Sequence, residues 1–306
     1  MYYLDRINID VIKHRNKWFI ISGLLILASI ILLATRGLNL GIDFTGGTIL
    51  QRTFTQEVSV GQIRDALNQE PLAQYGLAET AVIQQLEGNR VIIKVSYLSP
   101  QEEKAVDAGL EKLVAPLDRG QSSTDTVGAV IGKELYTKAL WAVILSSILI
   151  LIYISFRFEF KFGVAAVIAL VHDVVITLGA FALLGHEINS TFVAAMLTIV
   201  GYSINDTIVI FDRIREHLRF RKKETIGELV NQSINETLSR SINTVITTLV
   251  TMVALYFFGG ATIKTFALAL IIGIGLGAYS SIFVAGSIWE AWKEWEFTKQ
   301  QKAKIA

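Results

Sequence analysis

The sequence predicts a membrane all-α bundle of six transmembrane helices, with one small extracytoplasmic α+β domain inserted after the first helix. Three observations lead to this fold class. Of the 306 residues, 52% are hydrophobic and only 18% are charged, which is too apolar for an ordinary soluble domain. Six stretches approach the roughly 20 mainly apolar residues that a membrane-spanning helix needs. One long polar stretch separates the first two of them.

In chain order, the predicted spans are residues 18–34, 140–156, 162–184, 192–211, 242–258 and 266–289. All three prolines fall in the polar stretch, where a helix-breaking residue does least harm. We therefore expect uninterrupted spans. The alternative for the first stretch is a cleavable signal peptide. Its apolar run is longer than a usual signal core, and residues 33–36 form a poor small-residue cleavage site.

Basic residues orient the chain, because short cytoplasmic loops are enriched in lysine and arginine. They gather before span one, between spans two and three, after span four and after span six, as Lys13, Arg15, Lys17, Arg157, Lys161, Arg213, Arg215, Arg219, Arg221, Lys222, Lys223, Lys293, Lys299, Lys302 and Lys304. If the spans alternate, all these segments lie on one side. We expect a cytoplasmic N-terminus with span one (1–36), an exported domain (37–138), five spans (139–292) and a cytoplasmic tail (293–306).

The exported domain has alternating β-rich and helical segments. Residues 47–54 and 90–97 are β-rich, while residues 59–68 and 99–113 carry helical spacing, with Ser59 and Ser99 as candidate N-caps. This pattern predicts a small α+β sandwich of the ferredoxin-like kind.

Several classes of chemistry are not expected. The exported domain has no His cluster, phosphate-binding glycine loop or nucleophile elbow, so we do not expect an enzyme. The chain contains no cysteine, which excludes disulfides and cysteine metal sites, and we predict neither a cofactor nor a metal. A net charge of +1 gives no sign of a nucleic-acid partner.

The cytoplasmic segment 213–241, between spans four and five, contains a further helical pattern. Thr225 and Glu228 form a plausible capping box. Apolar residues follow at helical spacing, namely Ile226, Leu229, Val230, Ile234 and Leu238. Two interpretations remain open: an amphipathic helix on the cytoplasmic membrane face, or a helix packed on the ends of the bundle.

Asp206, beside Asn205 in span four, is the first candidate functional residue. An ionisable side chain inside the membrane costs several kcal/mol on insertion scales, and so predicts a function. A carboxylate in a medium of low dielectric is costly to ionise, and can then take up or lose a proton near neutral pH. Asp206 is also too deep and too short to reach the interface. We therefore expect it to be the proton-coupling acid.

Arg240 opens span five, which should run antiparallel to span four, and it is the candidate counter-charge of Asp206. A polar stripe follows it at helical spacing, consisting of Thr244, Thr247, Thr248 and Thr251. Such a stripe should face the bundle or water, and could form a proton path. The alternatives are that Arg240 extends to the cytoplasmic interface and that the threonines bond to their own helix or join neighbouring helices.

Two further patterns lie within the spans. His172 and Asp173, in the middle of span three, are either a mutually satisfied structural pair or a proton-transfer pair, and the pattern favours the structural interpretation. Span six carries small residues at intervals of four, namely Ala269, Gly273, Gly277, Ser281 and Ala285. This ladder predicts the close approach of another helix.

Four further motifs occur along the chain, namely residues 41–47 (GIDFTGG), residues 157–160 (RFEF) with His172 and Asp173, residues 201–207 (GYSINDT), and residues 211–216 (FDRIRE). In this order and topology they resemble the SecD/SecF family of bacterial protein-export proteins, within the resistance-nodulation-division superfamily. The resemblance spans nearly the whole chain. In this family an acidic residue of span four and an arginine at the start of span five are implicated in proton movement, and these positions fall on Asp206 and Arg240.

The resemblance also implies a function. The exported domain is short, as in the smaller of the two family members, so a separate SecD partner is implied. The chain would use the proton motive force with SecD to promote late steps of polypeptide translocation across the bacterial cytoplasmic (inner) membrane. Implied partners are the SecYEG channel, YajC, YidC, the unfolded polypeptide and membrane lipids.

Two rival functions remain. A small-molecule or lipid exporter of the same superfamily would need an apolar substrate cleft in the exported domain. A non-transporting scaffold of the translocon would tolerate charge-neutral substitutions at Asp206.

Overall fold

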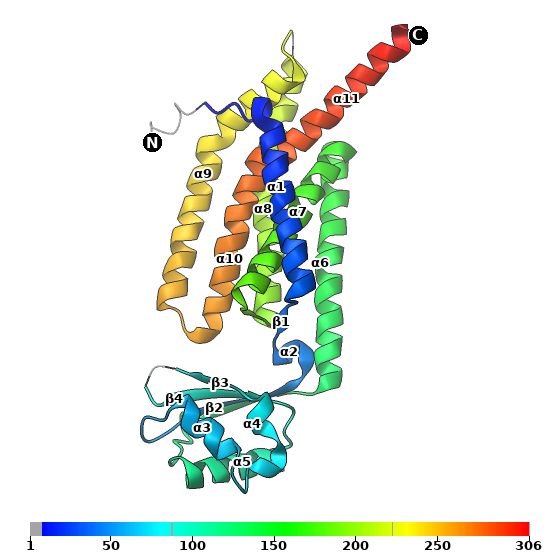
Figure 1. Cartoon of the computed structure of the whole chain (residues 1–306). Coiled ribbons are helices and arrows are strands. Elements are labelled where there is room, and N and C mark those ends of the chain that lie inside the picture. The colour runs from blue at the N-terminus through cyan, green and yellow to red at the C-terminus, as the bar shows by residue number, and fades with distance from the viewer. Residues whose placement is uncertain (1–7, 87, 222, 306) are drawn as a thin grey trace. The chain divides into compact units, whose positions relative to one another are not determined.

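The computed structural model describes residues 8–86, 88–221 and 223–305, which form two compact units (Figure 1). One unit consists of Leu40–Ala139, and the other combines the chain up to Asn39 with the chain from Leu140 onward. Lys222 lies outside the described residues, as do the side chains of Lys302 and Lys304.

Six helical segments in the described residues are long and apolar enough to cross a membrane, which confirms the predicted number of spans. They are Ile12–Thr35, Ala129–Arg157, Phe160–Leu184, Ser190–Phe220, Ile226–Phe258 and Ile263–Gln300. The corresponding elements are η2 (Ile12–His14) with α1 (Arg15–Thr35), α6 (Ala129–Arg157), α7 (Phe160–Leu184), α8 (Ser190–Phe220), α9 (Ile226–Phe258), and α10 (Ala261–Tyr279) with η4 (Ser280–Ala285) and α11 (Gly286–Ile305). Two short strands, β1 (Asn39–Leu40) and β6 (Glu187–Ile188), lie outside the helices.

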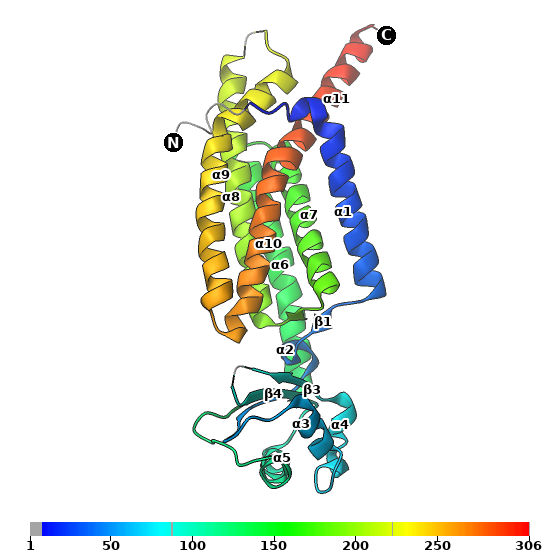
Figure 2. The same ribbon diagram turned by 60° about the vertical axis from the view of Figure 1, so that its left-hand side comes forward.

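Helices α7, α8 and α10 form the centre of the membrane unit, with α1 against α7 and α9 against α8 and α10 (Figures 1 and 2). The close contact between α8 and α10 follows from the small residues on α10, because these let another helix approach closely. A Cβ added to Gly273 would lie 2.2 Å from Ile199 Cδ1, and one added to Gly277 would lie 3.0 Å from Ser203 Cβ. The ladder of span six is therefore a helix-packing surface, as predicted.

The segment 213–241, predicted to be cytoplasmic and amphipathic, is helical over most of its length. Residues 213–220 continue α8, and residues 226–241 are the first half of α9, which runs unbroken into the fifth span. The apolar residues between Ile226 and Leu238 are buried against Phe162, Phe211 and Trp289 at one end of the bundle. Of the two interpretations, packing on the bundle is therefore the one observed. The predicted Thr225–Glu228 capping box begins α9.

The sixth span is continuous from Ile263 to Gln300, but it contains a π-helical turn at Ser280–Ala285 that was not predicted. A π turn inserts one extra residue per turn, and such turns are frequent at functional sites. Here the turn places Ser280 and Ser281 side by side in the interior, where both are fully buried.

The unit Leu40–Ala139 contains a four-stranded antiparallel sheet in the order β3-β4-β2-β5. Its elements are α2 (Ile42–Thr45), β2 (Gly47–Thr53), α3 (Val60–Leu67), η3 (Ala73–Tyr75), α4 (Leu77–Thr80), β3 (Val82–Gln85), β4 (Arg90–Val95), α5 (Pro100–Leu113) and β5 (Ser123–Val127). Leu50 of β2 pairs with Ile93 of β4 and with Thr124 of β5. Helices α3 and α5 cover one face of the sheet (Figure 2).

The predicted N-caps are observed in this unit. Ser59 and Ser99 each form a complete capping box with the residue three positions on, Gln62 and Glu102. The apolar sides of both helices then join the strands in a single buried core. β3 and β5 were not predicted, because β3 is only four residues long and β5 is a polar strand of sequence STDTV.

One buried cation is part of this unit. Arg52 of β2 is 2% exposed, and its guanidinium lies 2.6 Å from Asp107 Oδ1 and 3.1 Å from Glu103 Oε1, both on α5. It also donates to the carbonyl of Ser123 at 2.6 Å. A buried charge is tolerated when it is paired and hydrogen-bonded, so this arginine joins α5 to the sheet.

Candidate functional site

Asp206 lies on α8, which begins at an Asn189 side-chain cap and runs 31 residues to Phe220. Its side chain is only 7% exposed. Within the described part of the chain, the carboxylate has no hydrogen bond and no ion pair within 4.0 Å. Asn205, beside it in sequence, is exposed on another side of the helix. Asp206 is thus a buried acid without a direct partner among the residues that the structure describes.

Arg240 lies on α9, which runs beside α8 (Figure 2). Its charge acts electrostatically on Asp206, although the two side chains form no ion pair. The arginine is exposed and lines a cavity of about 340 Å³, together with Asp212 and Glu216 of α8 and Arg157 of α6. Arg240 therefore acts on the buried acid and also shares a cavity with charged residues at the end of α8.

The threonine stripe of α9 does not point into the bundle. Thr244 and Thr248 are half-buried, and Thr247 and Thr251 are exposed. Each hydroxyl donates to a carbonyl of its own helix three or four residues earlier. Self-bonding, the alternative interpretation of this pattern, is the one observed.

His172 and Asp173 form a buried cluster with hydroxyl groups from neighbouring helices. His172 Nδ1 is 2.9 Å from Asp173 Oδ1. The second oxygen of Asp173 accepts two hydrogen bonds of 2.7 Å, from Ser203 of α8 and from Ser280 of the π turn. One carboxylate therefore connects α7, α8 and η4.

The cluster extends through residues that the sequence did not identify. Thr207 and Ser281 share a hydrogen bond of 2.8 Å, and Ser281 also donates to the carbonyl of Ser203 at 3.1 Å. Tyr279 stacks on the His172 ring, with centroids 5.9 Å apart. The sequence does show small hydroxyl residues in apolar helices. Such hydroxyls commonly bond to a carbonyl of their own helix, so their presence does not indicate a partner on another helix.

Ion pairs link the ends of the helices on one side of this unit. Arg15, the first residue of α1, pairs with Glu290 and Glu294 of α11, and Lys161 pairs with Glu296. The Ile9 amide donates to Asn235 Oδ1 of α9 at 2.8 Å. Ile9 and Arg15 are thus fixed to the same end of the bundle as α11 (Figure 2).

Comparison with known proteins identifies a family over most of the chain. Residues 109–295 match the C-terminal part of the protein export membrane proteins SecD/SecF, and residues 31–58 match the SecD/SecF GG motif. A protein translocase subunit SecF from Sebaldella termitidis is 42% identical over 283 residues, which cover 92% of this chain and 91% of the relative. Another, from Alicyclobacillus acidocaldarius, is 40% identical and covers 97% of both chains.

Solved structures agree with this result. SecDF from Thermus thermophilus, a translocon-associated membrane protein, is 38% identical, with a TM-score of 0.84 over 96% of this chain. SecDF in its super-membrane-facing form is 36% identical, with a TM-score of 0.71 over 98% of this chain. The chain spans 40% of the length of each SecDF chain. By sequence, motifs and fold, this multi-pass membrane chain belongs to the SecD/SecF family of protein export membrane proteins.

Proposed function

We propose that this SecF-type subunit of the protein translocase couples the proton motive force to late steps of polypeptide translocation, with Asp206 as the proton-binding group. The observation that carries the proposal is the isolation of this carboxylate. It is 7% exposed among apolar helices and has no direct ion-pair partner in the described residues. A proton that binds there changes the charge of the interior, where an uncompensated charge is costly.

Arg240 supplies the positive charge that interacts with Asp206 in this proposal. With Asp206 ionised, the two side chains attract each other between adjacent helices. Protonation removes the attraction, and α8 and α9 are then free to rearrange. One proton crossing the membrane potential provides about 2.3 kcal/mol per 100 mV, which is enough to bias two states that differ by a few kcal/mol.

The exported unit would transmit this motion to the polypeptide. We infer a ferredoxin-like domain, a proposal supported by the order β2-α3-β3-β4-α5-β5 and by the sheet order β3-β4-β2-β5. Basic residues at the other ends of the spans favour cytoplasmic termini and an exported domain at 37–138. In this arrangement the domain holds or releases an emerging chain and prevents its return.

The proposed partners follow from the family and from the length of the relatives. The chain covers 40% of each SecDF, so a separate SecD would supply the remaining part. The complex would work beside the SecYEG channel, with YajC and YidC as further candidates, in the bacterial inner membrane. The substrate would be an unfolded polypeptide, and the role is transport rather than catalysis.

The test compares Asp206→Asn with Asp212→Asn, a matched control on the same helix whose carboxylate is exposed. Both chains are assembled with SecD and the channel in inverted vesicles, and polypeptide import is measured with and without a proton gradient. We expect Asp206→Asn to abolish the stimulation by the gradient and Asp212→Asn to retain it. Equal stimulation in the two variants would refute the proposal.

A further inference from the structure

A second buried titratable pair lies on α7, outside the Asp206–Arg240 element. His172 is 3% exposed and Asp173 is fully buried. Asp173 has partners for both of its oxygens. His172 does not: its Nε2 atom is buried and has no hydrogen-bond partner among the described residues. An unsatisfied buried polar atom is rare in folded proteins and requires an explanation.

The partners of Asp173 assign the proton on the imidazole ring. Two serine hydroxyls donate to one oxygen of Asp173 at 2.7 Å, an arrangement that suits an ionised carboxylate, which only accepts hydrogen bonds. The contact of 2.9 Å between His172 Nδ1 and the other oxygen then requires that Nδ1 carries the hydrogen. In the neutral ring, Nε2 is consequently an open acceptor.

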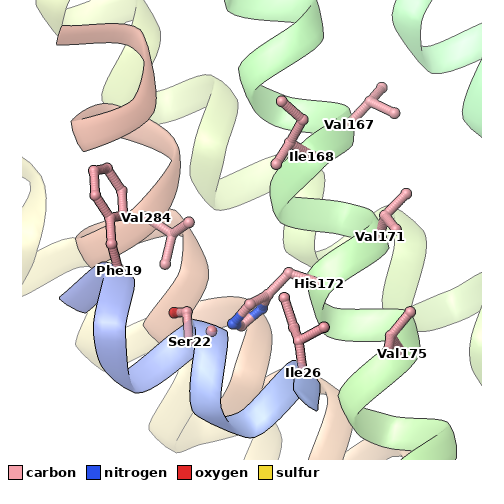
Figure 3. Close-up of a pocket in the computed structure, with 10 residues that line it drawn as sticks. Phe19, Ser22, Ile26, Val167, Ile168, Val171, His172, Val175 and Val284 are labelled. Carbon is pink, nitrogen blue, oxygen red and sulfur yellow. The ribbon is translucent and has the colours of Figure 1, made fainter. Parts of the chain in front are cut away.

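His172 itself lines a cavity. A space of about 390 Å³ lies between α1 and α7, and its lining includes His172, Ser22, Phe19, Ile26 and Val284. Figure 3 shows the imidazole ring reaching from α7 toward α1, beside Ser22. Ser22 is already engaged with the Tyr279 hydroxyl, at 3.1 Å. Among the described polar side chains of this lining, His172 is therefore the one with an unpartnered atom, and its Nε2 is the candidate acceptor of a proton.

The surroundings suit a charge on this ring. Asp173 fixes its orientation and would stabilise an imidazolium, which is the role of the aspartate in a hydrogen-bonded Asp-His pair. Tyr279 of α10 stacks on the ring, and an aromatic face attracts a cation. The other elements packed against the pair bring Ser22 from α1 and Ser203 from α8, and α8 carries its own acid, Asp206, three residues after Ser203.

We propose that His172 and Asp173 form a second proton-binding site, in which the Nε2 lone pair of His172 takes a proton from water or hydronium that enters the cavity between α1 and α7. The proton adds to the ring without loss of the Nδ1 hydrogen. The pair thereby changes from a net negative charge to a neutral ion pair.

The hydrogen bonds of Asp173 give the site a route to the rest of the bundle. Ser203 lies one turn before Asp206 on α8, and Ser280 opens the π turn of the sixth span. A change of charge on the ring acts directly on the carboxylate that holds both serines. Proton binding at His172 is therefore expected to act on the position of α8. This coupling rests on the proposed function, whereas the binding of the proton does not.

The test is ¹⁵N NMR of the full chain in lipid bilayers, with His172 as the only histidine. The sequence contains four histidines, so the variant carries His14→Gln, His186→Gln and His217→Gln. We expect a ring protonated at Nδ1 alone at alkaline pH, and at both nitrogens after acidification. A ring protonated at Nε2 alone, or one that stays neutral on acidification while the protein remains folded, would overturn the proposal. If the single-histidine chain does not fold, the difference between the spectra of the native chain and His172→Gln provides the same signals.

Two variants separate this inference from the proposed function. In the single-histidine chain, Asp173→Asn removes the ionised acceptor, so loss of the Nδ1-protonated form is expected. Asp206→Asn should leave the acidification change at His172 in place, although it abolishes gradient-driven transport. Unchanged spectra in Asp173→Asn would contradict the assignment of the pair. Loss of the His172 signal change in Asp206→Asn would show that the site is not separate.

Discussion

Gly273 on α10 provides a test of the packing on which the proposed motion depends. A Cβ at this position would lie 2.2 Å from Cδ1, 2.5 Å from Cγ1 and 2.9 Å from Cγ2 of Ile199. Three atoms of one branched side chain are too close, so a rotation about χ1 cannot clear them all. Gly273→Ala must therefore separate α8 and α10. Overpacking of this kind costs about 1–3 kcal/mol.

Gly275→Ala is the matched control, since nothing lies within 4 Å of a Cβ at that position on the same helix. Both substitutions add the same methyl group and the same helix propensity, so the difference between them isolates the steric cost. We expect Gly273→Ala to be less stable than Gly275→Ala by about 1–3 kcal/mol, measured as the free energy of unfolding in bicelles. Ile199→Ala removes the three crowding atoms and should recover part of the loss in the double variant. Equal stability of the two alanine variants would refute the packing argument.

Three further outcomes are expected. Arg52→Met leaves two carboxylates without their buried cation and should destabilise the exported unit by about 3 kcal/mol, measured by hydrogen exchange of the β2 amides. Arg119→Met, the control at an exposed arginine, should change the stability of the exported unit by less than about 1 kcal/mol. Hydrogen bonds at the start of α5 lower the pKa of Glu102, so its contribution is present above its unfolded pKa and is lost as pH falls through the lowered folded value. Glu102→Gln should therefore reduce the acid sensitivity of the unit, read from its unfolding between pH 6 and about 3. Arg240→Met should reduce gradient-driven translocation to the level of Asp206→Asn, and an intact rate would show that the two residues do not act together.

Much of the fold could be predicted from the sequence, because long apolar helices and N-caps are local features. The six spans follow from length and hydropathy alone, and Ser59 and Ser99 mark helix starts through bonds that reach only three residues. β5 was missed because its sequence is polar, and it is held by pairing with the distant strand β2. The π turn was missed because nothing in the sequence SSIFVA breaks a helix.

The candidate site was predictable only in part. A lone acid in an apolar helix is visible in the sequence, and the structure places Asp206 in the interior. The partners of Asp173 were not visible, because Ser203 and Ser280 lie 30 and 107 residues away. Their contacts depend on the register of three packed helices. The prediction that the threonine stripe of α9 faces the bundle rested on residue spacing. Spacing places hydroxyls on one face of a helix but does not identify their hydrogen-bond acceptors.

The central claim is that Asp206 carries protons during translocation, and proton flux tests it most directly. Inverted vesicles with the chain, SecD and the channel are loaded with a pH-sensitive dye, and the lumen pH is recorded while polypeptide is imported. We predict that the lumen becomes more alkaline with import in the native chain and in Asp212→Asn, but not in Asp206→Asn. The same alkalinisation in Asp206→Asn would contradict the account.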